Sequence, residues 1–134
     1  MPMRQTFWRI LLFLLLAAVA YLSLAAFPAG AVPGNKLTRM IASALFGDVS
    51  TADKVGHFIA YFSLGAAAFA AHVARRSLWL APLLITLYGV ALEGAQYFLT
   101  YRTSDIADAV VNGVAATSGF VVAAVLKKRI VEKF

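Results

Sequence analysis

The stretch from residue 78 to residue 99 reads LWLAPLLITLYGVALEGAQYFL, and it decides the fold class. Its length suits a helix that crosses a hydrocarbon core of about 30 Å, which takes roughly 20 apolar residues. Similar stretches lie at residues 8–27, 55–74 and 106–126. A transmembrane β-strand would alternate apolar and polar residues over about ten positions, which these stretches do not do. The sequence therefore predicts an all-α integral membrane bundle of four transmembrane helices.

The composition favours the same class. Hydrophobic residues make up 62% of the 134 residues and charged residues 13%, and the mean hydropathy is +0.82. A soluble domain of this composition would not have enough polar groups to cover its surface. Because four spans nearly exhaust the chain, we expect a single domain over residues 1–134. The chain has no cysteine, which excludes disulfides and thiol chemistry.

The basic residues predict the topology. The net charge is +6, but the Lys and Arg residues are dispersed at the ends of the apolar stretches, so we expect no nucleic-acid partner. Eight of them fall on one side of the predicted membrane and four on the other. The eight are Arg4, Arg9, Arg75, Arg76, Lys127, Lys128, Arg129 and Lys133, and the four are Lys36, Arg39, Lys54 and Arg102. The positive-inside bias then puts both termini in the cytoplasm.

Two segments before residue 53 leave alternatives open. Arg4, Arg9 and the apolar run after them imitate a secretory signal peptide that is cleaved near residues 29–31, although a run of roughly 18 residues is longer than the usual 7 to 15. In the connection from Pro28 to Ala52, residues 36–46 carry apolar side chains at helical spacing. They predict either a short interfacial helix between the first and second spans or a surface loop with a single helical turn.

Polar side chains recur at helical spacing near the predicted outer ends of three spans. They are Asp53, His57 and Tyr61 in the second span, Glu93 and Gln96 in the third, and Asp105, Asp108 and Asn112 in the fourth. A carboxylate at the centre of a membrane helix costs about 2.5 to 3.5 kcal/mol on insertion scales, so such residues are by default functional. Small residues continue the stripes, which lets the helices approach closely. We expect the three faces to converge on one hydrated, outward-facing pocket.

The pattern Asp53-Lys54-x-x-His57-x-x-x-Tyr61, then Glu93-x-x-Gln96, then Arg102-x-x-Asp105-x-x-Asp108-x-x-x-Asn112, resembles the VanZ-like family of small bacterial integral membrane proteins. The resemblance covers residues 53–119, with Ala115 standing where the family usually has glycine. It implies a multi-pass protein of the bacterial cytoplasmic (inner) membrane. Through the member that gave the family its name, it also implies a link to teicoplanin-type antibiotic resistance.

The candidate roles follow from depth and charge. Glu93 is the strongest candidate because it lies roughly 9 Å inside its helix end and needs a partner, for which Arg102, His57 and Lys54 are available. His57 is either a structural histidine of the bundle or a general base. The catalytic candidates are thus Glu93, His57 and Asp108. The ligand-binding candidates are Lys54, His57, Tyr61, Gln96, Arg102, Asp105 and Asn112. We expect His72, at the other end of its span, to be structural.

Two chemistries fit this cluster. A metal site would use His57, Glu93 and Asp108, but the cluster has one histidine and no compact ligand motif, so no metal or cofactor is predicted. An anion site would use Lys54, His57 and Arg102 to hold a phosphate or carboxylate, with Glu93 or Asp108 as base or orienting group. Its depth suits a polyprenyl phosphate or another lipid-linked envelope ligand.

Three functions remain open on the sequence alone. The first is a non-enzymatic envelope protein that binds a lipid headgroup or glycopeptide-related ligand and influences antibiotic susceptibility. The second is an enzyme that acts on a phosphorylated or acylated envelope lipid, although no nucleophilic serine motif, P-loop or dinucleotide fingerprint indicates a reaction class. The third is an accessory subunit of a larger membrane complex.

Overall fold

The computed structural model of the chain is mostly helical over the residues that it describes, which are 3–26, 34–71, 79–101 and 105–131. The elements are α1 (Met3–Leu24), α2 (Asn35–Phe46), the 3-10 turn η1 (Val49–Thr51), α3 (Ala52–Ala70), α4 (Leu80–Tyr97) and α5 (Ile106–Val131). These ranges contain no strand, which confirms the predicted all-α class.

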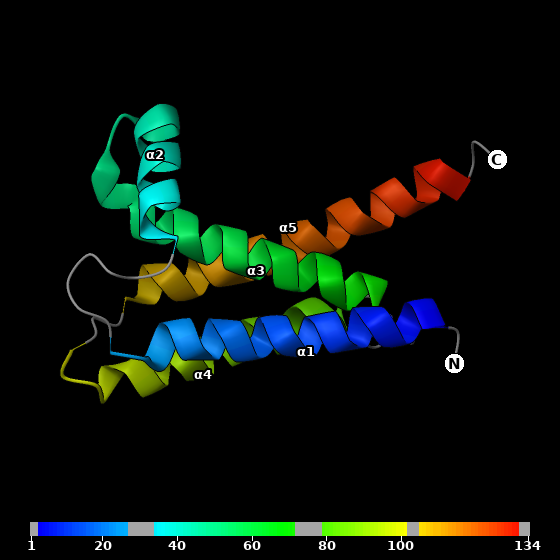
Figure 1. Cartoon of the computed structure of the whole chain (residues 1–134), viewed down its shortest axis with the longest axis horizontal. Helices are drawn as coiled ribbons and strands as arrows, with labels where there is room; N and C mark the ends of the chain where they lie inside the picture. The colour runs from blue at the N-terminus through cyan, green and yellow to red at the C-terminus, as the bar shows by residue number, and fades with distance from the viewer. Residues whose placement is uncertain (1–2, 27–33, 72–78, 102–104, 132–134) are drawn as a thin grey trace.

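Four of the helices run alongside one another, and the remaining helix, α2, lies across one end of them. Figure 1 shows α1, α3, α4 and α5 with their long axes roughly aligned, whereas α2 stands across the N-terminal end of α3. The largest interface joins α3 to α5. The first described turn of α1 and the last of α5 lie at the same end of the bundle, opposite α2 (Figure 1).

The membrane-span prediction is supported for two of the four helices. Within the described residues, the segments Gln5–Leu24 and Ile106–Arg129 are long and apolar enough to cross a membrane. Helices α3 and α4 do not meet the same measure, because the polar residues at one end of each lower its mean hydropathy. The four-span bundle therefore stays a prediction. The helix ends also differ from the predicted spans, since α1 begins before residue 8 and α5 continues beyond residue 126.

Two glycines bring α3 and α5 into backbone contact. A Cβ atom added to Gly65 would collide with the carbonyl oxygen of Ala116, and one added to Gly119 would collide with the carbonyl oxygen of Phe62. Ala115 and Ala116 are fully buried beside this crossing, so the methyl group of Ala115 is accommodated where the family pattern has glycine. The small-residue stripes read from the sequence therefore form the tightest helix contact.

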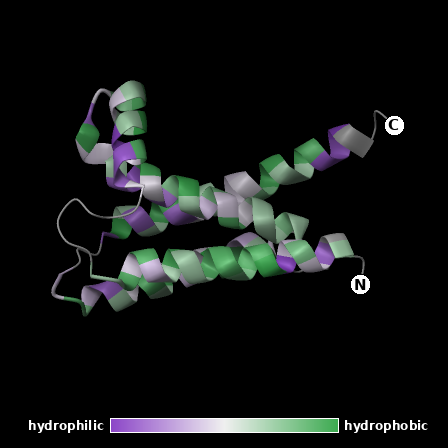
Figure 2. Ribbon diagram, viewed as in Figure 1, coloured by the Kyte–Doolittle hydropathy of each residue, from purple (hydrophilic) through white to green (hydrophobic). Residues whose placement is uncertain are grey.

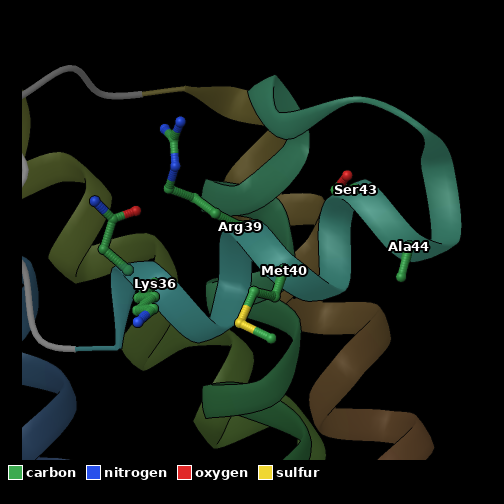
Figure 3. A pocket seen from close by; sticks show the side chains of 6 residues that line it. Lys36, Arg39, Met40, Ser43 and Ala44 are labelled. Carbon is green, nitrogen blue, oxygen red and sulfur yellow. The ribbon is translucent and has the colours of Figure 1, made fainter.

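The connection before α3 contains a true helix. Helix α2 has 12 residues and is flanked by two capping glycines in the left-handed conformation, Gly34 (φ 83°) and Gly47 (φ 67°). It packs on α3 through Ala42, which is buried with Ala52 and Val55. The alternative of a loop with a single helical turn is wrong. The outer surface of α2 carries an open depression lined by basic and apolar side chains, among them Lys36, Arg39 and Met40 (Figure 3).

Side chains of α4 and of the residues after it hold α1 in place. The hydroxyl of Tyr88 donates to the carbonyl oxygen of Leu16 at 2.6 Å, and Nε2 of Gln96 donates to the carbonyl oxygen of Ser23 at 2.9 Å. The hydroxyl of Tyr101 reaches the carbonyl oxygen of Leu24 at 2.9 Å. These bonds fix the C-terminal end of α1 next to the polar ends of α3, α4 and α5.

Candidate functional site

The polar residues predicted from the sequence gather at the end of the bundle that carries α2. Helices α3 and α5 begin at this end and α4 finishes there (Figure 1). The first turns of α3 and α5 and the last turns of α4 therefore face one another. The side chains that meet there are Asp53, Lys54, His57 and Tyr61 from α3, Glu93 and Gln96 from α4, and Asp105, Asp108 and Asn112 at the start of α5.

Lys54 joins α3 to α5 through two carboxylates. Its Nζ lies 2.8 Å from Oδ2 of Asp105 and 2.8 Å from Oδ1 of Asp108. The Asp108 side chain is only 5% exposed, whereas that of Asp105 is 51% exposed. The hydrogen bond from Lys54 lowers the pKa of the Asp105 carboxyl, and so does the hydrogen bond from the backbone N–H of Ala107. The ammonium group of Lys54 is thus already engaged and sits at the rim of the site.

His57 is the centre of the cluster, and its two ring nitrogens face different groups. Nδ1 lies 2.9 Å from Oδ1 of Asn112, a fully buried residue, and the ring stacks on that of Tyr61. On the other side, Nε2 faces Oδ2 of Asp53 and Oδ2 of Asp108, each at 3.9 Å. These two separations are too long for hydrogen bonds. Asp53, His57 and Asp108 each have one potential ligand atom within 4.8 Å of those of the other two.

Glu93 reaches the cluster from α4, where the backbone of Asp105 and the ring of His57 face its carboxylate. Its side chain is 9% exposed, and its Oε1 lies 3.9 Å from Nδ1 of His57. Among the described residues, neither Oε2 of Glu93 nor Nδ2 of Asn112 has a hydrogen-bond partner, although both atoms are buried. Gly89 lets α4 approach Tyr61 and Asn112 closely, because a Cβ at this position would lie 2.9 Å from the Tyr61 ring and 3.1 Å from Nδ2 of Asn112.

The cluster opens into a cavity between α1, α2 and α3. The cavity has a volume of about 440 Å³. Asp53, His57 and Asp108 lie on its polar side, and its apolar side includes Val19 and Leu22 from α1. The site therefore combines charged groups with an apolar wall.

The charge balance of the described site is acidic. Four carboxylates, those of Asp53, Glu93, Asp105 and Asp108, surround one lysine and one histidine. Counting His57 as neutral, the formal charge of these groups is −3, from four negative groups and one positive group. Such a balance favours a cation over a bare anion.

The comparison with family models matches residues 6–127 to the family described as VanZ/LLP1. The chain belongs to the VanZ/LLP1 family. The resemblance read from the polar pattern is thereby confirmed, and the matched range contains every residue of the site. Neither a curated protein nor a solved structure matched the sequence.

In this VanZ/LLP1 chain the structure brings together most of the residues predicted for the site. His57, Glu93 and Asp108 converge, and Asn112 and Tyr61 support the ring of His57. Gln96 lines the cavity while its amide holds α1. Arg102 and His72 lie outside the described residues. The catalytic and ligand-binding roles of these side chains stay predictions.

Two contributions escaped the sequence reasoning. The sequence puts Asp53 on the polar face of the second span but assigns it no catalytic or ligand-binding role, and the structure places its carboxylate with that of Asp108 around Nε2 of His57. The spacing of four residues between Asp53 and His57 was the available signal. The cavity wall from α1, including Val19 and Leu22, had no signal, because an apolar residue of a membrane helix looks the same whether it faces lipid or a ligand.

Proposed function

We propose that this chain is a multi-pass protein of the bacterial cytoplasmic membrane that binds the headgroup of an envelope lipid in the cavity between α1, α2 and α3. The observation that carries the proposal is the mixed wall of that cavity, in which the Asp53, His57 and Asp108 cluster adjoins apolar side chains of α1. A lipid likewise combines a polar headgroup with apolar chains in one molecule. The volume of about 440 Å³ falls in the range of small-ligand sites, about 300 to 1,000 Å³.

The membrane setting has support from the outer surface of the bundle. Large apolar side chains are exposed along the helices, among them Phe13 at 70%, Leu87 at 54% and Val114 at 56%. Figure 2 shows this apolar colouring over the middle of α1, with hydrophilic residues toward the two ends of the bundle. Exposure of so many large apolar side chains is unfavourable in water and suits a lipid environment. In the proposal, α3 and α4 span the membrane beside α1 and α5.

The orientation of α2 supports a site at membrane-surface depth. Helix α2 lies across the bundle end, and it exposes Leu37 at 58%, Met40 at 61% and Phe46 at 63% beside its basic residues (Figures 1 and 3). This mixture of exposed apolar and basic side chains is typical of an interfacial helix. With both termini cytoplasmic, α2 and the cavity would face the outer side of the membrane. By its family resemblance, occupancy of the cavity would influence teicoplanin-type susceptibility.

The test compares two glycine replacements. Gly56 lines the cavity, and a Cβ there would meet only the methyl group of Thr38, at 3.6 Å. Gly94 is exposed on α4, and a Cβ there would meet nothing within 4 Å. The side chain introduced by Gly56→Leu has room to enter the cavity, whereas that of Gly94→Leu points into open space. Both changes raise helix propensity equally, so the pair isolates the effect of filling the cavity.

Lipids that copurify with detergent-extracted protein would be quantified by mass spectrometry. We expect wild type and Gly94→Leu to retain a defined lipid at about one molecule per chain, and Gly56→Leu to lose most of it. Equal lipid content in all three proteins would refute the proposed cavity. If the cellular effect follows occupancy, a strain with Gly56→Leu would share the antibiotic susceptibility of a strain that lacks the protein.

A further inference from the structure

We propose that Asp53, His57 and Asp108 bind one divalent transition-metal ion of the zinc or manganese type. All three residues line the cavity, so an ion has a path to them. Nε2 of His57 is 3.9 Å from a carboxylate oxygen of each aspartate. Ligands bound at about 2.0 to 2.2 Å to a common ion are separated by up to about 4.4 Å, so these separations suit a shared ion and not a direct hydrogen bond.

The orientation of the histidine favours the same ion. When Nδ1 donates its hydrogen to Oδ1 of Asn112, 2.9 Å away, the neutral ring presents a lone pair at Nε2. That lone pair then faces the carboxylates of Asp53 and Asp108, an arrangement that is repulsive until a cation lies between them. Metal-binding histidines commonly donate their second ring N–H to a neighbouring acceptor, which fixes the ring in place.

An independent observation comes from Glu93. Its side chain is 9% exposed, it approaches Nδ1 of His57 to 3.9 Å, and its Oε2 has no hydrogen-bond partner among the described residues. The backbone N–H of Asp105 and the His57 ring offset part of the charge of this carboxylate, but burying its second oxygen without a hydrogen bond remains expensive because desolvation penalises the charge. The ammonium group of Lys54 is already paired with Asp105 and Asp108. A divalent ion at His57 would supply positive charge to this side of the site as well.

The three atoms that would bind the ion indicate which kind of ion it is. One imidazole nitrogen with two carboxylate oxygens suits zinc and manganese, whereas magnesium and calcium take oxygen ligands almost exclusively. The ion would leave coordination positions open toward the cavity. There it would bridge the acidic cluster to a phosphate-bearing headgroup, a consequence that rests on the proposed function.

The test measures zinc binding to the full-length protein in detergent. Protein without an affinity tag is stripped with a chelator, and Zn²⁺ alone is titrated at pH 7 by calorimetry. We expect one zinc per chain. Asp53→Asn should lower the affinity at least about tenfold. The side chain of Asp53 is 75% exposed, so this variant keeps its fold, which circular dichroism would check.

Matched controls identify the ligands. Asp48→Asn removes another exposed charge, from the turn before α3, and His72→Gln removes the other histidine of the chain. Both should bind zinc as wild type does. Absence of zinc binding, or binding that survives Asp53→Asn and is lost in His72→Gln, would overturn the site. Zinc binding without copurified lipid would support the ion and refute the lipid proposal, and bound lipid without zinc binding would do the reverse.

Discussion

At the scale of single residues, Lys54 is the contact on which the mouth of the site depends. Its ammonium group is the only cation that the described residues place between Asp105 and Asp108. The helical spacing of Asp53 and His57 predicted their shared face. The pairing of Lys54 was not predictable, because it depends on how α5 is rotated against α3, and single-helix spacing carries no information on that rotation.

Lys54→Met should therefore destabilise the fold. The Asp108 carboxylate, 5% exposed, would lose its cation, and leaving a buried polar group unsatisfied costs about 1 to 3 kcal/mol, or more when the group is charged. The loss of stability should lie toward the lower end of this range, since the Lys54 side chain is 42% exposed and screened by solvent. Thermal unfolding in detergent measures the effect, with Lys36→Met on α2 as the control. Equal midpoints for the two variants would show that the bridge is not structural.

The Asp105 contact should depend on pH in a defined direction. Because Lys54 lowers the pKa of Asp105, the pairing contributes stability that is fully present above the unfolded pKa, about 3.9. That stability is lost as the pH falls through the lower folded pKa. The unfolding midpoints of wild type and Asp105→Asn should differ by a constant amount at pH 5 to 7 and converge as the pH falls below the unfolded pKa and through the lower folded pKa. A difference that grows toward acid pH would contradict this assignment.

At the scale of elements, the crossing of α3 and α5 positions the site. Gly65→Ala and Gly119→Ala each place a Cβ against backbone of the facing helix, so α3 and α5 must separate. We expect a loss of about 1 to 3 kcal/mol, the usual cost of overpacking. Gly94→Ala, with open space around the new methyl group, should be neutral or stabilising. Thermal unfolding and membrane accumulation of the three variants would test this, and equal values would refute the close crossing.

The same elements show how far sequence reasoning reached. Apolar length predicted the four long helices, and small residues on the polar stripes predicted which faces meet. Helix α5 continues beyond the predicted span, through Val131, because a helix continues by its own hydrogen bonds after the apolar run stops. Helix α2 stayed undecided because its burial rests on Ala42 and few other contacts, and its ends depend on glycine conformations at Gly34 and Gly47.

At the scale of the whole molecule, α2 and the cavity should face the outer side of the membrane. The chain has no cysteine, so single cysteines can be introduced at Ser50, Ser77 and Thr103 without background. An impermeant thiol reagent applied to intact spheroplasts should label positions 50 and 103 and leave position 77 unlabelled. Permeabilised cells, as the control, should label all three. The opposite pattern in intact cells would invert the topology.

If the acidic cluster binds a ligand and is not merely architectural, Asp108→Asn should separate the two roles. The amide oxygen can still accept from Lys54, so the fold should persist while the charge facing His57 is lost. The measurement is the amount of copurified lipid per folded chain, taken together with the unfolding midpoint. We predict a near-wild-type midpoint with most of the bound lipid lost. A lowered midpoint with the lipid fully retained would instead make the cluster a structural feature of the bundle.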